Sequence, residues 1–140
     1  MSSSEIVLKC HKIIGGYAEG EALVSDEAIC FYLVDPKTGK VVERNHRLEG
    51  KNVADKVLVF SSGKASSVVQ VDGLFKLALN KTAPRAMIVN KVETVLVVSA
   101  MLANIPLVDK LEKNPLEIIR TGDLVKVDAN KETVTVIKRE

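Results

Sequence analysis

Residues 61–67 combine hydroxyl groups, a glycine and a lysine in a way that suits anion binding. The run contains four serines together with Gly63 and Lys64, and it lies between an apolar segment and a helical pattern. The first N–H groups of a helix lack intrahelical partners and carry partial positive charge, and a glycine lets a ligand approach the backbone. This loop is therefore a candidate site for a phosphate or a carboxylate.

The loop does not match the common nucleotide-binding motifs. In the P-loop pattern GxxxxGK[ST], the first glycine would fall at Leu58, and Ala65 stands where Ser or Thr is required. The dinucleotide pattern GxGxxG is missing, and the pair Gly15 and Gly16 lies between predicted strands. Walker-type, nicotinamide and flavin sites are thus disfavoured.

A serine of this loop has simpler interpretations than catalysis. A nucleophilic serine needs a base, but the sequence has no GxSxG, and His11 and His46 are both far away in the chain. Ser66 or Ser67 could be only a helix N-cap, a role worth about 1 kcal/mol. Lys64 by itself is typical of a solvated lysine. His46 is typical of a loop histidine whose ring is hydrogen-bonded to the backbone. The loop by itself leaves these interpretations open.

Composition and charge favour one cytoplasmic domain over residues 1–140. The chain has 140 residues, of which 46% are hydrophobic. This is enough for one domain with a core, whereas two domains would each be too small. Its 20 Lys and Arg against 18 Asp and Glu give a dispersed net charge of +2, which disfavours nucleic acid as a partner. No segment approaches the roughly 20 apolar residues that span a bilayer, and residues 1–5 lack a signal-peptide pattern.

The two cysteines do not indicate a metal site. Cys10 and Cys30 are far apart, without CxxC spacing, and two thiols cannot supply the four ligands of a typical zinc or iron–sulfur centre. We expect both to be buried free thiols, and we expect no metal held by this chain alone.

The middle of the chain predicts alternating strands and helices. Apolar residues recur every three or four positions after residue 67, which indicates a helix with one packed face. A second helix, with Asn90 as its predicted N-cap, is apolar nearly all round and is expected in the interior. The predicted elements are a strand at Lys56–Phe60, a helix at Val68–Asn80, a strand at Ala86–Val89, a helix at Lys91–Ala103 and a strand at Ile105–Val108. This β-α-β-α-β series favours parallel pairing with right-handed crossovers.

Both ends of the chain are predicted to be strand-rich. In the first half, short β-branched runs separated by turn residues predict strands at Glu5–His11, Ala22–Ser25, Ala28–Val34 and Lys40–Arg44. At the other end, Leu124–Asp128 and Thr133–Lys138 flank a turn at Asn130 and Lys131, which predicts a β-hairpin.

The order and spacing of landmarks along nearly the whole chain resemble one family. These landmarks are residues 20–25, Val34, Asp35, Pro36, Thr38, Gly39, His46, Leu48, Gly50, Lys56–Phe60, Gly63, Lys64, Ser66, Ser67, Ala83, Pro84, Ala86, Ile88 and residues 105–109. The chain resembles the small subunit family of archaeal phosphomevalonate dehydratase and aconitase X, which is the swivel-domain piece of the aconitase superfamily.

The resemblance implies an α/β fold and a shared active site. The fold would be a swivelling β/β/α domain that closes over an aconitase-like large subunit, and that subunit would carry a [4Fe-4S] cluster. By position, Ser66 would be the proton acceptor, with Gly63, Lys64, Ser67 and His46 as substrate-binding residues. The implied reaction is dehydration of (R)-5-phosphomevalonate to an anhydromevalonate phosphate in an archaeal-type mevalonate route to isoprenoids.

Two other functions remain open at this stage. The chain could be a noncatalytic module that binds an anion or a partner protein and keeps only the swivel fold. It could also serve a dehydratase for another hydroxy acid, in which case the large subunit would select the substrate. Only the family register favours Ser66 over Ser62 or Ser67 as the base.

Overall fold

The computed structural model describes residues 5–27, 29, 31–61, 68–92 and 94–138. The strands are β1 (Glu5–Lys9), β2 (His11–Ile14), β3 (Tyr17–Val24), β4 (Val57–Phe60), β5 (Ala86–Val89), β6 (Leu107–Asp109), β7 (Leu124–Asp128) and β8 (Thr133–Ile137). The helices are α1 (Val68–Leu79), α2 (Thr94–Ala103), the short α3 (Pro115–Ile118) and a 3₁₀ turn, η1 (Phe31–Leu33).

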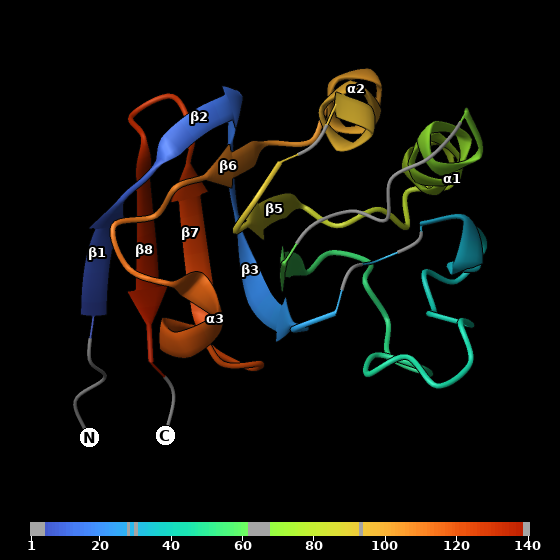
Figure 1. Ribbon diagram of the computed structural model, residues 1–140, viewed down its shortest axis with the longest axis horizontal. Coiled ribbons are helices and arrows are strands. Elements are labelled where there is room, and N and C mark those ends of the chain that lie inside the picture. The colour runs from blue at the N-terminus through green and yellow to red at the C-terminus, as the bar shows by residue number, and fades with distance from the viewer. Residues whose placement is uncertain (1–4, 28, 30, 62–67, 93, 139–140) are drawn as a thin grey trace.

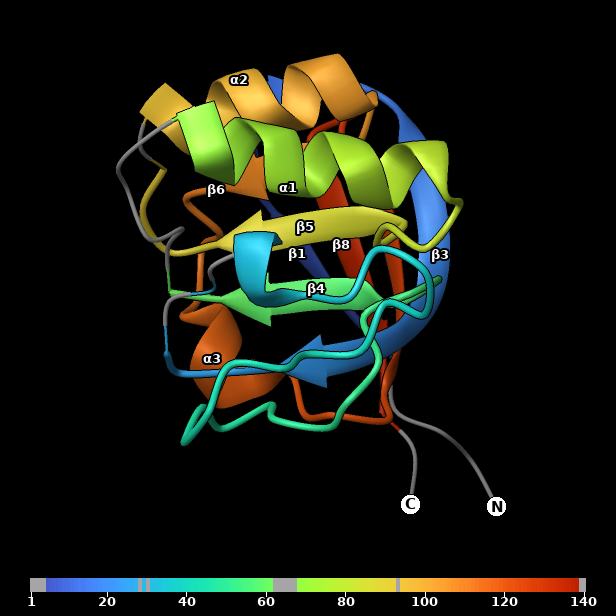
Figure 2. The ribbon, with the colours of Figure 1, turned by 90° about the vertical axis from the view of Figure 1, so that its right-hand side faces the viewer.

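The chain forms a layer of helices, a parallel sheet and an antiparallel sheet. Strands β3, β4, β5 and β6 are parallel neighbours, and α1 and α2 lie side by side over one face of them (Figure 2). On the other side of the molecule, β1, β8 and β7 form antiparallel pairs, with α3 beside them (Figure 1). The expected β/β/α architecture is confirmed.

The alternation of side chains along β4 explains why two cores form. Leu58 and Phe60 pack in the core under α1 and α2, whereas Val57 and Val59 pack in the core shared with β7, β8 and α3. Successive residues of a strand point to opposite faces, so an apolar run of this kind is stable only when both faces are covered. All four residues of β4 are fully buried.

The long strand β3 joins the two sheets. Its residues 17–21 pair antiparallel with β7, and its residues 22–24 pair parallel with β4. At Gly20, near the change of partner, a Cβ atom would lie 2.9 Å from the backbone oxygen of Asp55. A side chain at this position would force the backbone apart.

The central β-α-β-α-β series and the C-terminal hairpin are confirmed, with β5 and β7 within the predicted bounds. The predicted strand Glu5–His11 is divided: β1 pairs with β8, and β2 begins at His11 and pairs with β6. α2 begins at Thr94 rather than Lys91, so the prediction of Asn90 as its N-cap is wrong.

Two further expectations in the first half are wrong. Residues 31–33 form η1 instead of the strand predicted at Ala28–Val34, because Phe31 turns inward and packs edge-on against Phe60. The segment predicted as a strand at Lys40–Arg44 contributes only isolated bridges, Val34 with Val41 and Lys40 with Asn52. Tight turns with carbonyl acceptors satisfy this backbone in place of a ladder.

The expectation that α2 lies in the interior is also wrong. Leu96, Ser99 and Ala100 are buried, but Met101 and Leu102 on the opposite face are 57% and 54% exposed. The helix therefore lies in an outer layer and packs through one face only. Within the described ranges, no helix is long and apolar enough to cross a membrane.

We predict that Gly20→Ala lowers the free energy of unfolding by about 1–3 kcal/mol, because the added methyl group overpacks the contact with Asp55. Urea denaturation measures the loss. Glu19→Ala, at the exposed neighbouring position, is the matched control and should change stability by less than about 0.5 kcal/mol. Equal effects of the two substitutions would contradict the close approach of Gly20 to the Asp55 backbone.

Candidate functional site

The carboxyl ends of three parallel strands define the edge at which the serine loop begins. β3, β4 and β5 end at Val24, Phe60 and Val89, and their arrowheads point to the same side of the molecule (Figure 2). Ligands of open α/β sheets commonly bind outside the carboxyl ends of the strands. We refer to this side of the sheet as the carboxyl edge.

Backbone hydrogen bonds connect the segments that leave these strands. The N–H of Ser25 donates to the carbonyl of Val59 at 2.8 Å, and the N–H of Lys91 donates to the carbonyl of Ser61 at 3.1 Å. The segments after β3 and β5 are thereby tied to the end of β4. Such ties give the loop after β4 a fixed starting point.

The residues predicted to carry the chemistry, Gly63, Lys64, Ser66 and Ser67, lie outside the described residues, as does Ser62. The described chain stops at Ser61, one residue beyond β4, and resumes at Val68, the first residue of α1. The roles predicted for these four residues therefore stay predictions.

His46 lies buried in a compact turn beside the segment that follows β3. Its Nδ1 accepts a hydrogen bond from the backbone N–H of Leu48 at 3.0 Å. Because Nδ1 is the acceptor, the neutral ring carries its proton on Nε2, which lies 3.9 Å from Oε2 of Glu27. With only 5% of the residue exposed, this geometry favours a histidine that holds the turn. Direct contact with a substrate stays a prediction.

An exposed ion pair also joins this turn to the segment that follows β3. The Arg47 guanidinium pairs with the Asp26 carboxylate at 2.6 Å, and both side chains are about 60% exposed. An ion pair this exposed contributes little to folding, about 0–1 kcal/mol. It nevertheless places two opposite charges on the surface next to the buried His46.

Sequence reasoning missed one polar pair at this edge. His11 Nδ1 lies 2.8 Å from Oδ1 of Asp109, the last residue of β6, because β2 pairs with β6 in a register that sets these residues opposite each other. The Asp109 side chain is buried, whereas that of His11 is half-exposed. The position of Asp109, directly after the apolar Leu107 and Val108, could have indicated a polar group at the end of this strand. Nothing in the local sequence indicated that β2 would pair with β6 and bring His11 beside it.

Both cysteines are expected from the sequence to be buried free thiols. Cys10 is free but only half-buried, and Cys30 lies outside the described residues. Burial, reinforced by the carboxylates of Glu132, Asp109 and Asp128, raises the pKa of the Cys10 thiol to about 11. Near neutral pH the thiol therefore stays protonated, which disfavours it as a nucleophile or a metal ligand. Among the residues that the structure describes, no group of three or more His, Cys, Asp or Glu side chains could hold a metal ion.

A sequence model of the family described as Aconitase X swivel domain matches residues 7–136. The chain belongs to the aconitase X swivel domain family. The chain is similar to the crystal structure of Thermococcus kodakaraensis aconitase X (holo-form), with 37% sequence identity and a TM-score of 0.86 over 95% of this chain and 99% of that one. The agreement extends over both sheets and the helical layer.

Similar swivel-domain proteins have names that state a function. The phosphomevalonate dehydratase small subunit of Methanocella arvoryzae is 49% identical over 86% of this chain and 92% of its own length. The phosphomevalonate dehydratase small subunit of Methanococcoides burtonii is 42% identical over 96% of this chain and 98% of its own length. These proteins are similar to the chain over almost their whole length.

The hydrogen bond from Leu48 to His46 generates a prediction for this swivel domain. His46→Ala should lower the free energy of unfolding by about 1–3 kcal/mol, since it leaves the buried N–H of Leu48 without its acceptor. His46→Asn is the matched variant, because an asparagine oxygen can accept from an N–H two residues further along. In thermal and urea unfolding, His46→Asn should lose at most half of the free energy of unfolding that His46→Ala loses. If Asn and Ala are equally destabilising, the acceptor role of Nδ1 is wrong.

Proposed function

We propose that this chain is the small subunit of a phosphomevalonate dehydratase and that it is active only with an aconitase-like large subunit. The observation that carries the proposal is the 49% identity to a phosphomevalonate dehydratase small subunit over 92% of that protein. The similarity of the fold to an aconitase X, with a TM-score of 0.86, also supports the proposal. We further propose that residues 1–140 act as one swivel domain in the cytoplasm.

The reaction is elimination of water from a β-hydroxy acid. A base removes the proton from the carbon next to the carboxylate, and the electron pair of that C–H bond forms the new double bond. The C–O bond to the hydroxyl breaks, and the hydroxyl takes up a proton and leaves as water. The product is an unsaturated acid that keeps the phosphate of the substrate.

Ser66 is the proposed base. A serine hydroxyl can accept this proton only as its anion, so its surroundings must favour negative charge. Ser66 comes two residues before Val68, where the 12-residue helix α1 begins, and a helix start offers N–H groups and partial positive charge. Lys64 adds a cation two residues before Ser66 in the sequence.

Gly63 and Ser67 complete the proposed anion-binding loop. A glycine allows backbone N–H groups to approach the substrate phosphate or carboxylate, and the Ser67 hydroxyl adds a further donor. His46 acts beside them by holding the turn that contacts the residues after β3. In this proposal the carboxyl edge faces the substrate.

The proposed partner supplies what this chain lacks among its described residues. The sequence holds two cysteines, fewer than the four thiolates that typically bind a [4Fe-4S] cluster, so we place the cluster in the large subunit. Bound there, it would supply Lewis-acid chemistry at the leaving hydroxyl. The small subunit then contributes the base and anion binding, and it excludes water when the carboxyl edge closes over the partner.

The experiment that tests this function uses the chain co-expressed with its large subunit and reconstituted without oxygen. We expect dehydration of phosphomevalonate by the native complex and a fall in kcat of about 10²–10⁴-fold for Ser66→Ala, since a positioned general base contributes roughly that factor. Gel filtration must show that the variant still assembles with the large subunit.

Ser62→Ala is the matched control, because it removes one hydroxyl from the same loop and has no proposed role. It should lower kcat by less than about tenfold. Ser67→Ala removes a proposed substrate donor and should act mainly by raising KM. If an assembled Ser66→Ala complex keeps full activity, the serine base is wrong. If the native complex dehydrates another hydroxy acid and leaves phosphomevalonate unchanged, the substrate is wrong, and a complex without dehydratase activity would favour a noncatalytic binding module.

The orientation of the chain against its partner has a separate test. Arg47 lies at the carboxyl edge beside Asp26, whereas Arg85 lies at the opposite edge, directly before β5, where it contacts Asp55 at 3.6 Å. We expect Arg47→Glu to weaken assembly at least tenfold, because it reverses a charge that faces the partner. Arg85→Glu carries the same change in net charge and should weaken assembly by less than twofold. Isothermal titration of the two subunits measures both values, and a larger effect of Arg85→Glu would contradict the orientation.

A further inference from the structure

Lys91 lies at the carboxyl edge, two residues after β5 and beside the residue at which the serine loop begins. β4 and β5 are parallel neighbours, and their last residues, Phe60 and Val89, lie opposite each other. The backbone N–H of Lys91 donates to the carbonyl of Ser61 at 3.1 Å, and Lys91 is exposed. One hydrogen bond therefore holds the Lys91 backbone against the first residue after β4.

The ammonium group of Lys91 is available to a ligand. Within the described ranges, the Lys91 side chain has neither an ion pair nor a hydrogen bond. Two carboxylates of the same edge already lie beside other partners. Asp26 pairs with Arg47 at 2.6 Å, and Asp109 Oδ1 lies 2.8 Å from Nδ1 of His11. An exposed cation that no described carboxylate neutralises is a suitable partner for an anionic group of a ligand.

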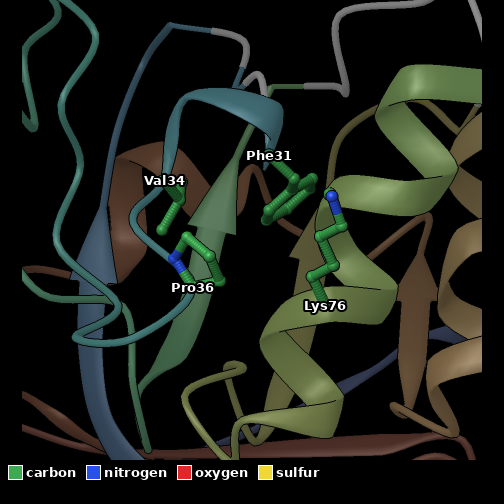
Figure 3. A pocket seen from close by; sticks show the side chains of 5 residues that line it. Phe31, Val34, Pro36 and Lys76 are labelled. Carbon is green, nitrogen blue, oxygen red and sulfur yellow. The ribbon is translucent and has the colours of Figure 1, made fainter.

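Lys76, on α1, is a less suitable cation. It already has an interaction partner in the folded chain. It also lines a small hollow together with Phe31, Val34 and Pro36, and Figure 3 shows it on the wall that faces these three residues. A phosphate at Lys76 would have to compete with a contact that the folded chain makes, whereas Lys91 makes no such side-chain contact with the described residues.

The substrate of the proposed reaction carries two anionic groups at different distances from the reacting carbon. Its carboxylate is bonded directly to the carbon that loses the proton, so the carboxylate must lie beside the base. Its phosphorus atom is separated from that carbon by five bonds, which places the phosphate roughly 6 Å away in an extended conformation. A loop that holds the carboxylate and the reacting carbon therefore needs a neighbouring segment to hold the phosphate.

The segment after β5 lies at a suitable distance for this role. Neighbouring strands are about 4.8 Å apart, so the chain that follows β5 begins one strand spacing from the chain that follows β4. The lysine side chain is a flexible stem of four carbons, which allows its ammonium to meet a phosphate a short distance from the loop. Lysine binds phosphate as a point charge, without the fixed geometry of an arginine fork.

We propose that Lys91 binds the phosphate of the substrate and thereby makes the site selective for a phosphorylated hydroxy acid. This inference rests on the proposed dehydration, and it assigns the selection of the substrate to a residue of this chain. Lys91 takes no part in the proton transfer. It holds the far end of the substrate, while the serine loop holds the carboxylate and the reacting carbon.

Steady-state kinetics of the assembled enzyme test this role. We expect Lys91→Met to raise KM for phosphomevalonate about tenfold to 100-fold, the effect of losing a hydrogen bond to a charged group, and to change kcat by less than about threefold. Lys91→Arg keeps the charge and should stay within about fivefold of the native KM. Lys110→Met is the matched control, because Lys110 is the first residue after β6 and the substitution changes the net charge equally. It should change KM by less than about twofold, since a solvated charge at a distance is screened.

Isothermal titration of the two subunits separates this role from a contact with the partner. Because Lys91 is exposed, Lys91→Met should unfold at the native temperature and bind the large subunit with the native affinity. If the variant instead assembles more weakly and keeps the native KM once assembled, Lys91 faces the partner protein and the inference is overturned. If the native enzyme dehydrates phosphomevalonate but Lys91→Met and Lys110→Met have the same KM, the phosphate role is wrong and the proposed function stands. A native complex that leaves phosphomevalonate unchanged would overturn both.

Discussion

The fold depends on covering both faces of the four-residue strand β4. Its alternate side chains enter two different cores, so α1 and α2 must cover one face and the β7–β8 hairpin the other. Each fully buried Leu, Val or Phe contributes about 1.5–3 kcal/mol relative to exposure, which makes these four positions costly to leave uncovered. β3 meets both demands, because it pairs with β7 through its first half and with β4 through its second half.

The same constraint positions the candidate site. A strand that is paired on both edges and packed on both faces has a rigid end, and the loop with Ser66 starts one residue beyond it. The hydrogen bonds from Ser25 to Val59 and from Lys91 to Ser61 tie the neighbouring segments to that end. A subunit that must bring a base to a partner's substrate needs such a rigid support, since small misplacements of catalytic groups reduce rates strongly.

Local patterns predicted much of this structure. The continuous apolar runs at β4 and β5 and the three- and four-residue spacing in α1 identified the parallel core, and the alternation in β8 identified the hairpin. The sequence did not predict η1, because residues 31–33 are of types that favour strands. The contact that places Phe31 in the core is with Phe60, which is distant in the sequence. The interpretation of His46 as a loop histidine satisfied by backbone is confirmed by the hydrogen bond from Leu48. The sequence did not predict the pairing of His11 with Asp109, which spans 98 residues. Contacts between distant segments leave no periodic signal in the sequence.

The central claim is that the carboxyl edge of this swivel domain brings a serine base to a substrate held by the large subunit. The most direct measurement is a crystal structure of the assembled enzyme with phosphomevalonate bound. The account predicts that Ser66 Oγ lies within about 3.5 Å of the substrate carbon next to the carboxylate, the distance of a reactive approach. A complex in which the end of β4 and the start of α1 face solvent, away from the substrate, would contradict it.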